Sequence, residues 1–232
     1  MEGNKKKRKI PKFVSYTLIL LVVGSICLYF SYPSILRGAG EFLAPDGTGK
    51  AEAKDRKYDA VILENEETVR ENAVKIGMNL LSSGKANRLV IVYQNPATGK
   101  IFGLPANFDQ YLTQRMEGLG LRRDQIKVIP VPGDHPITLT EASVVLSHLS
   151  KEEIRSVILL TEGFHTRRSY WAYKQVGAPM GVEVVPYPYF INYKVESWWE
   201  EEKGVRNFFG EAVKFIYYIF RGYIPIKSIV GT

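Results

Sequence analysis

A short apolar run followed by a histidine and two arginines is the part of this chain whose residue types suit chemistry. The run 157–160 predicts a buried strand, and Thr161 ends it just before His165, Arg167 and Arg168. An amphipathic segment follows and predicts a helix. In open α/β sheets, ligands bind at the carboxyl ends of the strands. The free N–H groups of a helix start and the two arginines favour an anion there, unless the arginines are only solvated parts of an ordinary connection.

His165 is the candidate general acid or base, because the ordinary pKa of histidine lies near neutrality. Arg168 follows one helical turn later and is suited to hold a phosphate or a carboxylate. Other candidates are a second catalytic residue, Glu141, and the ligand-binding residues Thr161, Thr138 and Arg167. The structural alternative is that His165 packs against its own helix while Arg168 pairs with Glu141, so that the pair holds two loops together.

Other catalytic templates are missing from the sequence. It contains no G-x-S-x-G elbow and no phosphate-binding P-loop. His135, His148 and His165 have neither HExxH spacing nor a cysteine partner, so we expect no metal site. We likewise expect no cofactor.

The N-terminus carries the pattern of a membrane anchor. Residues 1–12 form a tail with six basic residues and one acidic residue, and residues 13–36 contain no charge. About 20 apolar residues cross a bilayer, so this segment is long enough to span it, and Pro33 is expected to end the helix. The basic flank predicts a cytoplasmic N-terminus and an extracytoplasmic C-terminal part. A cleaved signal peptide is the alternative, but its apolar region is usually shorter.

The net charge of +7 does not indicate nucleic-acid binding, because most of it lies in the tail. Without residues 1–12 the net charge is +2. A nucleic-acid footprint needs basic residues clustered on a folded face. We therefore expect a membrane and an anionic small molecule as partners, and no nucleic acid.

The rest of the chain divides into a linker, residues 37–57, and one domain, residues 58–232. Apolar strand patterns alternate with helical ones along the domain. The predicted strands are 59–63, 88–93, 126–131, 157–161 and 181–185, and the predicted helices are 66–81, 107–119, 138–149 and one ending near Val176. This alternation predicts an α/β fold, a Rossmann-like three-layer sandwich with a mainly parallel sheet of about five strands, preceded by one transmembrane helix.

The domain resembles the YdcF-like family, which includes the SanA and ElyC types of bacterial envelope protein. The strongest match is the motif Thr-x-x-Phe-His-x-x-Arg, present from Thr161 to Arg168. A second motif, Thr-x-x-Glu-Ala, begins at Thr138, and the similarity extends over about residues 58–225. The family usually ends its first two strands in glycine pairs, whereas this chain has Asn65 and Asn95 in those loops. These asparagines are further candidate ligand-binding residues in a divergent member.

The C-terminal region is rich in aromatic residues and ends in an apolar segment, residues 211–223. We expect a long closing helix that covers one face of the sheet. The alternative is that its aromatic side chains lie against the membrane surface.

These expectations together predict a membrane-anchored protein that binds, with or without processing it, an anionic small molecule or lipid-linked phosphate in cell-envelope biogenesis. The resemblance implies the role in the envelope, and the arginines indicate the anion. The first alternative is a non-catalytic scaffold or regulator with an envelope-protein partner. The second, by analogy of fold, is a nucleotide or S-adenosylmethionine binder.

Overall fold

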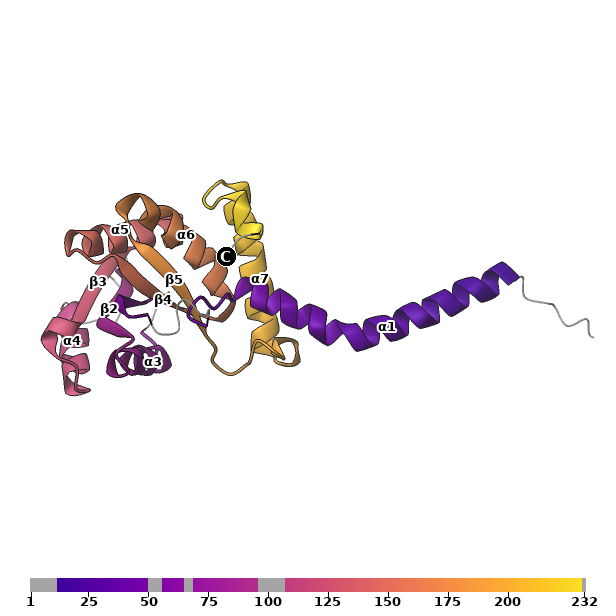
Figure 1. Ribbon diagram of the computed structural model, residues 1–232, viewed down its shortest axis with the longest axis horizontal. Coiled ribbons are helices and arrows are strands. Elements are labelled where there is room, and N and C mark those ends of the chain that lie inside the picture. The colour runs from indigo at the N-terminus through magenta and orange to yellow at the C-terminus, as the bar shows by residue number, and fades with distance from the viewer. Residues whose placement is uncertain (1–11, 50–55, 65–68, 96–106, 231–232) are drawn as a thin grey trace, which may run out of the picture.

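The computed structural model describes residues 12–49, 56–64, 69–95 and 107–230, and it shows an α/β domain joined to a long N-terminal helix (Figure 1). Five parallel strands form one sheet in the order β3-β2-β1-β4-β5. The strands are β1 (Tyr58–Leu63), β2 (Ala86–Asn95), β3 (Ile126–Pro132), β4 (Ser156–Glu162) and β5 (Glu183–Tyr189). The expected Rossmann-like parallel sheet is confirmed.

Helices cover both faces of the sheet, because alternate residues of the central strands point in opposite directions. Val61 and Leu63 pack in a core with α3 (Glu71–Ser82) and α4 (Phe108–Gly118). Ala60 and Ile62 pack in a second core on the other face. The helices α5 (Ile137–Lys151), α6 (Thr166–Gly177) and α7 (Glu202–Phe220) contribute side chains to that core.

The strand order creates one crevice at the carboxyl edge of the sheet. From β1 the chain moves outward to β3, and it then crosses back to β4 on the other side of β1. The connections that leave β1 and β4 therefore diverge, and ligands of doubly wound sheets bind at such a point. Glu64 follows β1 there, and the 3₁₀ turn η2 (Gly163–His165) follows β4.

The last strand is longer than expected. The prediction ended it at Val185, before two prolines, yet β5 includes Pro186 and Pro188. Its paired neighbour is β4, so it forms an edge of the sheet, where a missing N–H group is tolerated. The helix expected from Glu66 differs as well, since α3 begins at Glu71.

The N-terminal helix α1 (Lys12–Leu43) continues through Pro33, so the expected end of the helix at this proline is wrong. An internal proline costs about 3 kcal/mol, but the turns that follow it are fixed by the domain. The Trp198 Nε1–H group donates to the carbonyl of Leu36 at 2.9 Å, and Leu43 is buried in the core. The first part of the expected linker is therefore ordered helix. In Figure 1, α1 extends away from the domain at the end where α7 lies.

Arg167 fixes the end of α1 to the domain. Its guanidinium donates to the carbonyl of Phe42 at 2.9 Å and stacks 3.9 Å from the centre of the Phe42 ring. The same group donates to the carbonyls of Ser228 and Ile229 in the turn η5 (Ile226–Ile229), at 2.8 and 3.3 Å. One buried side chain on α6 thus joins the C-terminal end of α1 to the turn η5.

We predict that Arg167→Ala destabilises the protein by about 3 kcal/mol, because it leaves buried carbonyls without a charged donor. The melting temperature of the detergent-solubilised full chain should fall by roughly 6–12 °C. Arg123→Ala is the matched control, since the Arg123 side chain is 66% exposed. Equal melting temperatures for the two variants would show that Arg167 does not fix α1.

Candidate functional site

A cavity of about 480 Å³ lies at the crevice between the ends of β1 and β4. Glu64 forms one side of it, η2 and the end of β4 form another, and α7 forms a third. Its charged and polar lining consists of Glu64, Arg70, Glu162, His165, Lys203, Arg206, Asn207, Glu211 and Lys214. The tyrosines Tyr189 and Tyr193 also line it, together with Phe164 and Gly210.

A tight turn brings His165 to this cavity. Gly163 has φ of +51°, in the left-handed region, and a Cβ atom there would meet the hydroxyl of Tyr193. The Thr161 hydroxyl donates to the Thr166 hydroxyl at 2.7 Å, and Thr166 donates to the carbonyl of Gly163 at 2.6 Å. These buried bonds close the turn, and His165 stands at the start of α6.

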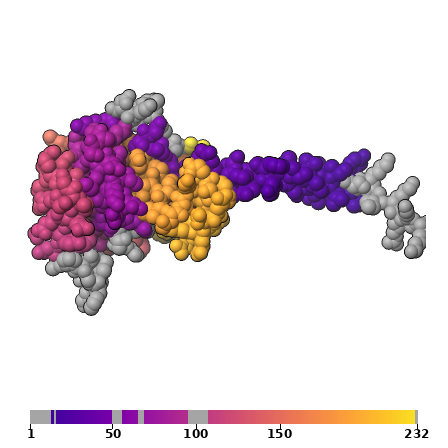
Figure 2. Space-filling view, turned by 90° about the horizontal axis from the view of Figure 1, so that it is seen from below, coloured from indigo at the N-terminus to yellow at the C-terminus, as the bar shows by residue number. Residues whose placement is uncertain are grey.

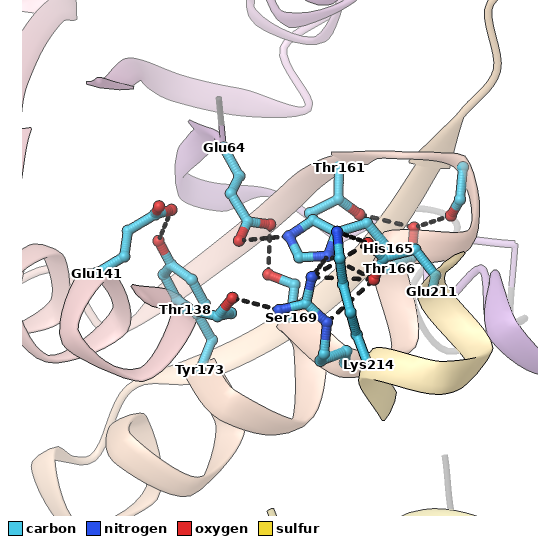
Figure 3. A network of polar contacts seen from close by, with 12 residues as sticks. Glu64, Thr138, Glu141, Thr161, His165, Thr166, Ser169, Tyr173, Glu211 and Lys214 are labelled. Carbon is cyan, nitrogen blue, oxygen red and sulfur yellow. Dashed lines mark hydrogen bonds and ion pairs between the residues drawn. The ribbon is translucent and has the colours of Figure 1, made fainter. Parts of the chain in front are cut away.

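His165 lies between two carboxylates. Its Nε2–H group donates to Glu64 Oε1 at 3.0 Å, and its Nδ1 atom lies 3.2 Å from Glu211 Oε2. The hydroxyl of Ser169 donates to the other oxygen of Glu64. Glu64 directly follows β1 and Glu211 lies on α7, so the imidazole joins two distant segments of the chain (Figure 3).

The two carboxylates determine the charge of His165. Burial of the ring lowers its pKa, but Glu64 and Glu211 raise the pKa of His165 from 6.5 to about 10. The Arg168 guanidinium, 2.8 Å from Nδ1, lowers the pKa of His165. The two carboxylates raise this pKa by more than Arg168 and burial lower it. The raised pKa favours the imidazolium form of His165 at neutral pH.

Arg168 does not line the cavity; it lies behind His165 and holds Glu211 in place. It donates from Nε to Glu211 Oε2 at 3.0 Å and from Nη1 to the Thr138 hydroxyl at 2.6 Å, and its guanidinium stacks on the Tyr218 ring. Burial alone raises the pKa of Glu211, but His165, Arg168 and Lys214 together hold it below its ordinary value.

The structure does not place Glu141 beside His165. Its buried carboxylate accepts a hydrogen bond from the Tyr173 hydroxyl at 2.9 Å. Figure 3 shows this pair at one side, with Glu64 and Ser169 between it and the imidazole. Burial, followed by the charge of Glu141, raises the pKa of Tyr173 well above its ordinary value.

The rim of the cavity is basic. Four cationic side chains and three carboxylates line it, and the protonated His165 adds a further positive charge. Glu162 is paired with Arg70 at 2.9 Å and with Lys203 at 3.6 Å, and Glu211 is paired with Lys214 at 2.9 Å. Within the described part of the chain, no carboxylate forms an ion pair with Arg206, which is exposed. The cavity therefore carries an excess of positive charge.

Of the predicted site residues whose side chains the structure describes, His165 alone lines the cavity. Arg168 and Thr138 form the layer behind it, Thr161 stabilises the turn, and Arg167 binds the end of α1. The alternative pairing of Arg168 with Glu141 is wrong, because the partner of Arg168 is Glu211. Asn65 lies outside the described residues, and Asn95 is described only as the last residue of β2.

Sequence reasoning missed Glu64 and Glu211 as site residues. Glu64 could have been identified from the sequence, because a charged residue directly after an apolar strand lies at the carboxyl edge of the sheet. Glu211 is an acidic residue within a mostly apolar helix, and a buried carboxylate requires a charged partner. That its partners are His165 and Arg168 depends on the tertiary packing of α7.

The geometry supports binding better than proton transfer. Both ring nitrogens of His165 lie within hydrogen-bond distance of carboxylates of the protein, so both already have protein partners. Among the described residues, no group of three or more histidine, cysteine or acidic side chains could hold a metal ion. What the site offers is a preformed, positively charged cavity.

Comparison with known proteins does not assign the chain to a family. No protein-family model matches the sequence, and no curated protein is significantly similar to it. The structure establishes an α/β domain with a five-stranded parallel sheet and an N-terminal apolar helix long enough to cross a membrane. Such a helix is compatible with an anchor or with a signal sequence.

We predict that the imidazolium of His165 makes stability depend on pH. Because its folded pKa of about 10 exceeds its ordinary value of 6.5, this contribution is complete below pH 6.5. It decreases as the pH rises and is lost above about pH 10. The melting temperature of the wild type should exceed that of His165→Gln most near pH 6, and the difference should shrink toward pH 10. A difference that does not change with pH would contradict the charged state.

Proposed function

We propose that this chain is a membrane-anchored protein that binds a phosphate- or carboxylate-bearing small molecule in the cavity between β1, β4 and α7. The observation that carries the proposal is the excess of basic side chains around a cavity at the switch point of the sheet. Doubly wound sheets bind ligands at this position, and cationic side chains recognise anions by charge-assisted hydrogen bonds. A phosphate group on a larger molecule fits a cavity of about 480 Å³.

An uncleaved anchor is favoured over a signal sequence by the packing of α1. Cleavage near residues 38–40 would cut inside the helix and separate Leu36 from Leu43. The carbonyl of Leu36 accepts a hydrogen bond from Trp198, and Leu43 is part of the core. The basic tail, residues 1–12, favours a cytoplasmic N-terminus, which places the cavity outside the cytoplasm.

The same observations support a divergent YdcF-like protein that acts in cell-envelope biogenesis. The residues that carry the resemblance, Thr161, Phe164, His165 and Arg168, lie at the end of β4, in the turn η2 and at the start of α6, next to the cavity. On this proposal the ligand belongs to the anionic precursors or lipids of the envelope. The alternative is a non-catalytic scaffold, which the buried positions of Arg167 and Arg168 favour.

We predict that Arg206→Ala lowers the affinity for phosphate-bearing ligands at least tenfold, because the loss of one charge-assisted hydrogen bond costs about 1.5–3 kcal/mol. Binding is measured as a thermal shift of the solubilised full chain with nucleotides, sugar phosphates and isoprenoid phosphates. At 100 times its dissociation constant a ligand stabilises the wild type by about 2.7 kcal/mol.

The matched control is Arg123→Ala, which removes an exposed arginine remote from the cavity lining and should leave the affinity unchanged. Arg206 is exposed as well, so neither change should alter the melting temperature without ligand. If no phosphate-bearing compound stabilises the wild type, the binding proposal fails and the scaffold is favoured.

A further inference from the structure

Helix α7 carries an exposed apolar stripe that the cavity does not explain. The stripe consists of four residues at spacings of four, three and four, so they share one face of the helix: Phe209, Val213, Ile216 and Phe220. Their exposed fractions are 59%, 67%, 51% and 85%. Exposed apolar surface of this kind marks an interaction site.

The other exposed face of α7 forms the cavity wall. Lys203, Asn207, Gly210 and Lys214 recur every three or four residues and line the cavity, and Arg206 lines it as well. With 3.6 residues per turn, Arg206 lies between this face and the apolar stripe. A molecule that covers the stripe would therefore lie next to the cavity wall.

Helix α7 lies at the end of the domain from which the apolar helix α1 leaves, as Figures 1 and 2 both show. Figure 1 shows α7 running across the direction of α1. Aromatic contacts join the two helices. Phe209 contacts Trp198, Trp198 contacts Trp199, and Trp199 contacts Tyr32 on α1 at ring distances of 6.4, 6.0 and 6.4 Å.

The charges of α7 suit an anionic lipid surface. With its two caps, α7 contains four basic and three acidic residues. Two of the acidic residues, Glu201 and Glu202, lie at its N-terminal end, and beyond them the helix carries only the buried Glu211. Interfacial helices combine an apolar stripe with flanking basic residues, and tryptophan and tyrosine concentrate at the headgroup level of a bilayer.

From these observations we propose that α7 lies on the outer surface of the membrane that α1 spans, and that the cavity takes its anion from the lipid headgroup layer. The ligand is then a phosphate-bearing lipid. This inference rests on the proposed function, because it specifies the source of the anion that the cavity binds. The bilayer, and not a second protein, is the occupant of the stripe.

The placement of α7 is tested with a fluorophore sensitive to polarity, attached to the full chain in lipid nanodiscs. The discs contain phosphatidylcholine and phosphatidylglycerol and hold one copy of the protein. In a Cys27→Ser background, the dye 7-nitrobenzoxadiazole is attached through Ile216→Cys or through the control Tyr111→Cys on α4. Ile216 and Tyr111 are both 51% exposed. Figure 1 shows α4 at the end of the domain remote from α1.

We expect blue-shifted emission and quenching by spin-labelled lipid at position 216, and neither effect at position 111. Equal water exposure at both positions would overturn the docking of α7. Shielding of position 216 only in discs that hold two copies would also overturn it, because a second chain would then cover the stripe.

The source of the ligand is tested on the same protein with phosphatidic acid and with inorganic phosphate. Native mass spectrometry should show retention of phosphatidic acid over phosphatidylcholine by at least about tenfold, and Arg206→Ala should abolish this preference. The variant Phe209→Ser/Val213→Ser/Phe220→Ser, labelled at position 216, should lose shielding in discs and keep the wild-type affinity for inorganic phosphate. Binding of inorganic phosphate without retention of the lipid would overturn the inference alone, and binding of neither would overturn the proposed function as well.

Discussion

The buried ion network around His165 is the constraint on which the site depends. Burying an unpaired charge costs several kcal/mol, so Glu64, Glu211, His165 and Arg168 are stable there only together. They come from three places in the chain: Glu64 directly follows β1, His165 and Arg168 lie in the turn and helix after β4, and Glu211 lies on α7. The network therefore fixes α7 against the sheet edge. That position of α7 gives the cavity its third wall and its basic rim, since Lys203, Arg206 and Lys214 all belong to this helix.

The network also separates the roles of two adjacent arginines. Residues 167 and 168 of a helix point in directions about 100° apart, so they cannot serve the same site. Arg168 points toward Glu211 and Thr138, whereas Arg167 points toward the end of α1 and the turn η5. The first arginine organises the cavity from behind, and the second sets the position of the apolar helix relative to the domain. A single helix start thus links the geometry of the candidate site with that of the candidate membrane anchor.

The sequence predicts the sheet well, because buried parallel strands are continuous apolar runs and the helices between them have amphipathic periodicity. Its errors lie where tertiary contacts outweigh local preference: α1 passes through Pro33 because the domain binds the following turns, and β5 includes Pro186 and Pro188 because it is an edge strand. The sequence also predicts a candidate site at the end of β4, where the structure has a cavity that His165 lines. The partners of His165 were not predictable from spacing. Glu211 is 46 residues away in the chain, and only the packing of α7 brings it to Nδ1.

The most direct test of this account is the protonation state of His165 in the full chain, measured by ¹⁵N nuclear magnetic resonance of the imidazole nitrogens near pH 8. The chain has three histidines, so variants at His135 and His148 assign the signals. The account predicts that both nitrogens of His165 carry protons, because two carboxylates raise its pKa to about 10. A neutral ring with a proton on Nε2 alone, whose Nδ1 accepts a hydrogen bond from Arg168, would contradict it. The cavity would then lack the positive charge of His165.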